Sequence, residues 1–162
     1  MNQQLLMQAL DCDNEQAILE GFMDRYQVSY QEAEDIFKET KKWLWLASQS
    51  EVTGTPVFID KPLMIIDEMW HTFILHTRSY YNFCLTHFQK LVHHNPTSPK
   101  EKEERRDEFL KNPTGAIKKH EEQLRTQYNL IYDNLGPETL LKWYDTMAQK
   151  YTPEYIRSIK KY

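Results

Sequence analysis

Histidine, cysteine and acidic side chains gather in one short stretch of this sequence, and these residue types bind transition-metal ions. Residues 66–96 contain five of the six histidines and one of the two cysteines. Asp67 precedes His71 by four residues and Cys84 precedes His87 by three, so each pair would lie on one side of a helix. Because carboxylate, imidazole and thiolate groups are ligands of zinc and iron, the stretch predicts a transition-metal site.

A helical projection at 100° per residue narrows the ligand set without fixing it. On one continuous helix His87 and His94 lie beside each other, near Tyr80 and Cys84, whereas His93 lies on the opposite side. Asp67 and His71 would complete the shell from a facing helix. The predicted ligands are Asp67, His71, Cys84, His87, His93 and His94, and three further residues are expected near the site: Trp70, His76 and Tyr80.

Each of these residues also has a purely structural interpretation. Asp67 and His71 could share a hydrogen bond on a helix surface, and Cys84 could be a small apolar residue of the core. His76 could interact with the carbonyls at a helix end, and His93 with His94 could form an exposed pair. The metal site is therefore predicted from the cluster as a whole.

Two other classes of function remain open on the sequence. The ten tyrosines and four tryptophans could form a partner-binding surface, which would make the chain a protein interaction module with structural histidines. A thiol enzyme would use Cys84 as nucleophile with His87 or His71 as base, but no glycine-rich turn lies nearby to stabilise an oxyanion. The sequence identifies no reaction, and we favour a binding domain over an enzyme.

The same stretch resembles the glycine-rich domain-containing protein-like family, known from plants and from shorter bacterial relatives. The resemblance rests on an Asp-x-x-Trp-His start, a Tyr-x-x-Phe-Cys segment and a His-His-x-Pro end. It covers about a fifth of the chain, and the matching residues are Ile66, Asp67, Trp70, His71, Ile74, Leu75, Thr77, Tyr80, Phe83, Cys84, Phe88, His93, His94 and Pro96.

What this resemblance implies is a set of functional residues without a settled activity, in a family whose plant members are linked to growth and stress responses. The implied residues are Asp67, Trp70, His71, Cys84, His93 and His94. Phe73 stands where the family has a second histidine, Gln89 stands where it has a glycine, and the glycine-rich tail is missing. The resemblance favours His93 with His94, whereas the projection favours His87 with His94. A helix that ends before His93 would remove this conflict.

A two-helix unit over residues 64–96 must position these side chains. Apolar residues recur at helical spacing on both sides of a break near Thr77 and Arg78. The stripe of the first helix contains Ile66, Met69, Trp70 and Phe73, and that of the second contains Tyr81, Cys84, Leu85, Phe88 and Val92. The two helices are expected to pack antiparallel.

The flanking sequence predicts further helices around this unit. A capping pattern at Ser29 and Glu32 begins a helix to about Ser48, and a glycine- and proline-containing loop follows at residues 49–63. A short first helix is expected to contain Leu5, Leu6 and Leu10, and a second to begin after Asp13 or Asn14. Three more helices are expected to begin at Thr114, Pro137 and Pro153. The charged run 100–108 is interpreted as a solvated helix face or a mobile connection. The chain is thus predicted to be one all-α domain, a single bundle of roughly six or seven helices over residues 1–162.

Composition sets the broad class of the protein. The 162 residues are 40% hydrophobic and 13% aromatic, which is enough for one core. A net charge of −4 without a basic face argues against a nucleic-acid partner, and no long apolar segment suggests a signal peptide or a membrane span. Two distant cysteines predict no disulfide. We expect a soluble, cytoplasmic protein, with secretion by a route without a cleaved signal left open, and a protein as the candidate partner.

Overall fold

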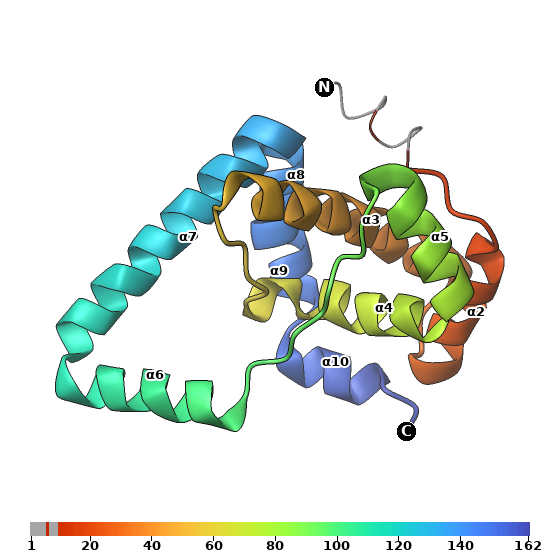
Figure 1. Ribbon diagram of the computed structural model, residues 1–162. Coiled ribbons are helices and arrows are strands. Elements are labelled where there is room, and N and C mark those ends of the chain that lie inside the picture. The colour runs from red at the N-terminus through yellow and green to blue at the C-terminus, as the bar shows by residue number, and fades with distance from the viewer. Residues whose placement is uncertain (1–5, 7–9) are drawn as a thin grey trace.

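The computed structural model describes residue 6 and residues 10–162, and over these residues the fold is all-α, as the sequence predicted. The described residues contain eight helices, with α8, η2 and α9 counted as one because they follow each other without a break. Their order in Figure 1 is α2 (Glu15–Arg25), α3 (Tyr30–Thr53), the 3-10 turn η1 (Lys61–Leu63), α4 (Met64–Leu75), α5 (Thr77–Phe88), α6 (Pro99–Lys111), α7 (Pro113–Leu135), α8 (Pro137–Leu141), the π-helical turn η2 (Lys142–Thr146), α9 (Met147–Lys150) and α10 (Pro153–Ile159).

The helix α3 begins at the predicted cap and ends later than predicted. The Ser29 hydroxyl accepts a hydrogen bond from the Glu32 backbone N–H at 3.1 Å, which satisfies a free donor of the first turn. The predicted loop over residues 49–63 was wrong in its first part, because the helix continues to Thr53. Gly54 ends it with a φ of 74°, a left-handed conformation that glycine adopts at low cost.

The predicted two-helix unit forms, but its second helix is shorter than the apolar spacing indicated. His76 separates α4 from α5, and α5 ends at Phe88 because Gln89 turns to a φ of 56°. The predicted apolar stripe was therefore partly wrong: Cys84 and Phe88 are buried on α5, but Tyr81 and Leu85 are exposed, and Val92 is buried only after the helix has ended. Residues 89–98 form an extended connection, which Figure 1 shows crossing α4 on its way to α6.

The charged run forms α6, a solvent-exposed helix that contributes nothing to the core. Ser98 and Glu101 form a reciprocal capping box at its start, and each of its residues is exposed. Figure 1 shows α6 meeting α7 at an elbow and lying away from α2 and α5. The predicted solvated helix is confirmed, and α6 lies on the outside of the packed helices of the all-α fold.

The two ends of the described chain are partly fixed by the core. The predicted first helix over Leu5, Leu6 and Leu10 lies mostly outside the described residues, although Leu6 and Leu10 are both buried. At the other end, the Gln27 N–H donates to the Ile159 carbonyl at 2.7 Å and the Lys161 N–H to that of Arg25 at 2.8 Å. The C-terminal residues are thereby attached to the end of α2. None of the helices within residues 10–162 is long and apolar enough to cross a membrane.

A buried carboxylate joins α3 to the C-terminal helices. Glu39 is 1% exposed, and its Oε1 accepts hydrogen bonds from Lys42 and Lys142, each at 3.1 Å. Its Oε2 accepts a third from the Trp143 indole at 2.7 Å. Burial lowers the pKa of Lys142, but the carboxylates of Asp35 and Glu39 outweigh this and raise it. A buried charge with this many donors is compensated as long as all of them stay in place.

Replacing Glu39 with alanine should destabilise the fold strongly, because the change removes one acceptor from each of two lysines and the acceptor of the buried Trp143 indole N–H. We expect the free energy of unfolding to fall by about 3–5 kcal/mol in urea titrations. Glu34→Ala is the matched control, since Glu34 is exposed on the same helix and should change the value by less than about 0.5 kcal/mol. Equal effects of the two substitutions would contradict the role given to Glu39.

Candidate metal centre

Three predicted ligands meet on the surface of α4. Asp67 and His71 come from that helix and His94 from the connection 89–98, and one ligand atom from each lies within 4.8 Å of the others. His94 Nε2 is 2.6 Å from Asp67 Oδ1, and His71 Nδ1 is 3.8 Å from Asp67 Oδ2. The two imidazoles stack with their centroids 4.5 Å apart. Two nitrogen donors and one carboxylate therefore face a common point.

The cluster lies at the boundary between the core and solvent. The side chains of His94, Asp67 and His71 are 16%, 24% and 42% exposed, so His71 forms the outer edge of the site. The inner edge is the indole of Trp70, whose ring centroid is 4.2 Å from that of His94. An ion bound by these three side chains would thus have protein on one side and water on the other.

The helix α4 supplies its two ligands through local geometry. Asp67 and His71 are four residues apart, which places them one above the other on an α-helix. The apolar side of the same helix is buried, where Phe73 packs edge-to-face with Phe37 of α3 at 5.0 Å. Packing of this apolar side fixes the rotation of α4, and that rotation turns Asp67 and His71 outward.

Bringing His94 to the site requires the chain to reverse after α5. Because α5 ends at Phe88, the next ten residues return across α4 in an extended form. The Tyr80 hydroxyl donates a hydrogen bond to the carbonyl of Val92, two residues before His94. The position of His94 is thus set by tertiary contacts and not by its place on a helix.

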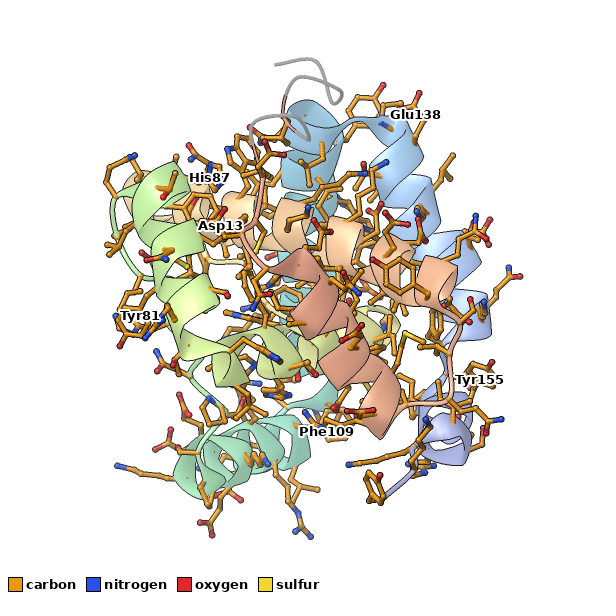
Figure 2. All side chains as sticks on the ribbon, turned by 90° about the vertical axis from the view of Figure 1, so that its right-hand side faces the viewer. Asp13, Tyr81, His87, Phe109, Glu138 and Tyr155 are labelled. Atoms are coloured by element: carbon orange, nitrogen blue, oxygen red, sulfur yellow. The ribbon has the colours of Figure 1, made fainter. Side chains whose placement is uncertain are left out.

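The remaining predicted ligands do not join this group. Cys84 is fully buried, and His93 is exposed next to His94. His87 bonds with the backbone carbonyl of Asp11 at 2.7 Å, and Figure 2 shows it near Asp13. The projection that paired His87 with His94 was wrong, because the helix on which it depended ends at Phe88.

Two of the residues expected near the site lie under it, whereas the third does not. The Trp70 indole N–H donates to the Tyr80 hydroxyl at 3.0 Å, so Trp70 and Tyr80 form the support below His94. His76 lies past the end of α4, where its Nδ1 is 3.0 Å from the Thr72 carbonyl. This agrees with the structural interpretation of His76 at a helix end.

Sequence reasoning missed an acidic residue beside the cluster. Glu68 follows Asp67 directly, and its carboxylate accepts a hydrogen bond from the buried hydroxyl of Tyr26. Burial and the nearby Glu68 carboxylate raise the pKa of Tyr26, so this phenol stays protonated as a donor. The consecutive acids at 67 and 68 were a visible signal, but nothing in the spacing pointed to Tyr26.

Both thiols have an environment that suppresses their reactivity. Burial raises the pKa of Cys84, and interactions with the Val92 backbone and the Tyr80 hydroxyl only partly oppose this. Burial also raises the pKa of Cys12 to about 12. Since the thiolate is the nucleophile, both groups are almost fully protonated near neutral pH. The structure gives the thiol-enzyme alternative no support.

The family model named UCP032817-like matches residues 5–129 of this chain. The match covers most of the sequence and includes α2–α6 and all three residues of the cluster. The chain therefore belongs to the UCP032817-like family. No curated protein and no solved structure is significantly similar to it.

This family assignment corrects the resemblance drawn from residues 66–96. The match to the glycine-rich domain-containing protein-like family was wrong, because the family shown by the long match is a different one. The short pattern of Trp, His, Cys and Pro misled because many of its positions have structural roles here: Trp70 and Tyr80 support a loop, and Cys84 is a core residue. The departures at Phe73 and Gln89 were in line with this outcome.

Alkylation should reveal two slow thiols in the folded protein. With iodoacetamide at pH 7 we expect Cys84 to react only after unfolding, because it is buried and its pKa is raised. The rate at Cys12 should keep rising with pH to near 12, since each step toward its raised pKa increases the thiolate fraction. Mass spectrometry of the wild type and Cys84→Ala assigns the sites, and rapid modification of native Cys84 at pH 7 would refute this description.

Proposed function

We propose that this member of the UCP032817-like family binds a divalent transition-metal ion, zinc or iron, through Asp67, His71 and His94. The observation that carries the proposal is the convergence of three donor groups, from two separate chain segments, within 4.8 Å. A two-His, one-carboxylate set suits zinc, and it is also the ligand set of non-haem iron(II) sites. The three residues were part of the ligand set predicted from the sequence.

The distances within the cluster fit a site that rearranges slightly on binding. Two ligands at about 2.0–2.1 Å from a tetrahedral zinc ion lie about 3.3 Å apart. The 2.6 Å between Asp67 Oδ1 and His94 Nε2 is a direct hydrogen bond, and it must lengthen when both atoms bind an ion. The 3.8 Å between Asp67 Oδ2 and His71 Nδ1 must shorten. These two changes are about 0.7 Å and about 0.5 Å. The ligand nitrogens of His71 and His94, which lie within 4.8 Å of each other, must also reach about 3.3 Å, so both imidazoles move when an ion binds.

Partial exposure of the cluster favours an ion with a free coordination position. Closed structural zinc sites use four protein ligands, whereas three ligands leave a position for water or for another molecule. His71 is 42% exposed, and so the free position would face solvent. When bound, such an ion supplies Lewis acidity, polarising a bound oxygen.

Metal binding should appear as a single site that depends on each ligand. We expect about one equivalent of zinc or iron in untagged protein purified without chelators, and a chelator should lower the melting temperature. His71→Ala and His94→Ala should each abolish the binding, and the double variant should lose no further stability, because the two act on one ion. Binding is measured by elemental analysis and by calorimetric titration with zinc.

His93→Ala is the matched control for this experiment. His93 is the direct neighbour of His94, is exposed, and does not join the cluster. Its substitution should leave the metal content unchanged. If the wild type holds no metal even after zinc is added back, Asp67 and His94 are a structural hydrogen-bonded pair and the proposal fails.

A second proposal, a protein interaction module, is favoured by the exposure of α6. A 13-residue helix without a buried residue gains almost no stability from its own fold. Apolar side chains are exposed at its elbow with α7, namely Phe109, Leu110 and Ile117. The run 100–108 has four basic and five acidic residues, so two antiparallel copies of α6 can pair opposite charges. The partner that we propose is therefore a second copy of this chain.

Sedimentation velocity tests this second proposal. We expect a dimer at micromolar concentration, which Leu110→Ser should convert to a folded monomer with the same helical circular-dichroism spectrum, because Leu110 is 66% exposed. Val52→Ser is the control, since Val52 is exposed on α3, away from the elbow. A wild-type monomer at the highest soluble concentration, or an equal effect of both substitutions, would refute the dimer.

A further inference from the structure

The hydroxyl of Tyr80 is connected to His94 by two separate routes. It accepts the indole N–H of Trp70 at 3.0 Å, and the Trp70 ring packs against the imidazole of His94 at 4.2 Å. The same hydroxyl donates to the carbonyl of Val92, which holds the backbone two residues before His94. One buried oxygen thus fixes both the surface on which the His94 ring rests and the main chain that carries it.

The Tyr80 hydroxyl of α5 contacts the connection 89–98, which has no regular secondary structure. Residues 89–98 have no helix or strand of their own, so no regular hydrogen-bond pattern fixes their backbone. The Val92 side chain is buried and belongs to the hydrophobic core, so apolar packing also holds the connection at this residue. The helix α5 therefore provides the support that holds the connection at Val92, although it supplies no member of the cluster.

We infer that Tyr80 is a positioning residue for the metal site, which holds His94 at Asp67 through Val92 and Trp70. The inference rests on the proposed metal-binding function and adds residues of α5 to a site whose ligands come from α4 and the connection. Partners behind the ligands keep a histidine oriented, and removing such a partner typically lowers metal affinity about 10- to 100-fold. Tyr80 acts on the backbone and on the neighbouring ring, and not on the imidazole itself.

The substitution Tyr80→Phe removes the hydroxyl and keeps the ring. The ring of Tyr80 packs edge-to-face with Phe73 at 5.0 Å, and a phenylalanine would preserve this contact. Without the oxygen, the Val92 carbonyl loses its donor and the Trp70 indole N–H loses its acceptor. The connection is then free to move, and His94 moves with it. We expect the zinc dissociation constant to rise about 10- to 100-fold.

Tyr151→Phe is the matched control for a general loss of packing. Tyr80 and Tyr151 are both 5% exposed, and the Tyr151 hydroxyl donates to Glu32 at 2.7 Å, a residue outside the cluster. Both substitutions should lower the melting temperature of the metal-free protein. Only Tyr80→Phe should weaken zinc binding, measured by competition with a chromophoric chelator, and alter the visible spectrum of the cobalt(II)-loaded protein, which reports the coordination geometry.

The outcomes separate this inference from the proposed function. If the wild type binds neither zinc nor cobalt, the metal site and the inference both fail. If the wild type binds and Tyr80→Phe binds equally well, only the positioning role is refuted, as it also is when Tyr151→Phe weakens binding to the same extent. Trp70→Phe is the second variant in case Tyr80→Phe does not fold: it retains an aromatic ring beside His94, removes the N–H, and should also lower zinc affinity.

Discussion

The buried carboxylate of Glu39 is the interaction on which the rest of this structure depends. It accepts hydrogen bonds from two lysines and from Trp143, and it thereby attaches α3 to the helices at the C-terminal end. The same helix α3 packs against α4 through the contact between Phe37 and Phe73. Since α4 supplies Asp67 and His71, a paired charge in the core contributes to the orientation of a site on the surface.

From α4 outward, the site is completed by a connection that has no regular structure. A loop can carry a functional side chain when a rigid scaffold positions it. Here α5 and α4 together provide that scaffold, because Tyr80 of α5 binds the backbone at Val92 and Trp70 of α4 provides the ring surface for His94. The two-helix unit therefore acts as support for the connection as well as a source of ligands.

Much of the architecture was predictable because helices depend on local signals. The cap at Ser29, the proline at position 153 and the charged run 100–108 all predicted elements that the structure contains. Two errors came from ends of helices that the apolar pattern did not mark. The helix α3 continues to Thr53 despite few apolar residues, and α5 stops at Phe88 although the stripe continues to Val92. In both cases one residue in the left-handed conformation ends the helix: Gly54 after α3 and Gln89 after α5. Glutamine rarely adopts this conformation, so the sequence did not predict the end of α5.

By itself, the sequence determined the all-α class, the stretch that holds the cluster, and the pairing of Asp67 with His71. These follow from composition and from helical spacing, which act over a few residues. Only the tertiary structure decided that His94 joins them, and that His87, His93 and Cys84 do not. The physical reason is that His94 reaches the site through a chain reversal held by contacts between α4, α5 and the connection. Such contacts join residues that are distant in sequence, so the spacing of residues along the chain does not predict them.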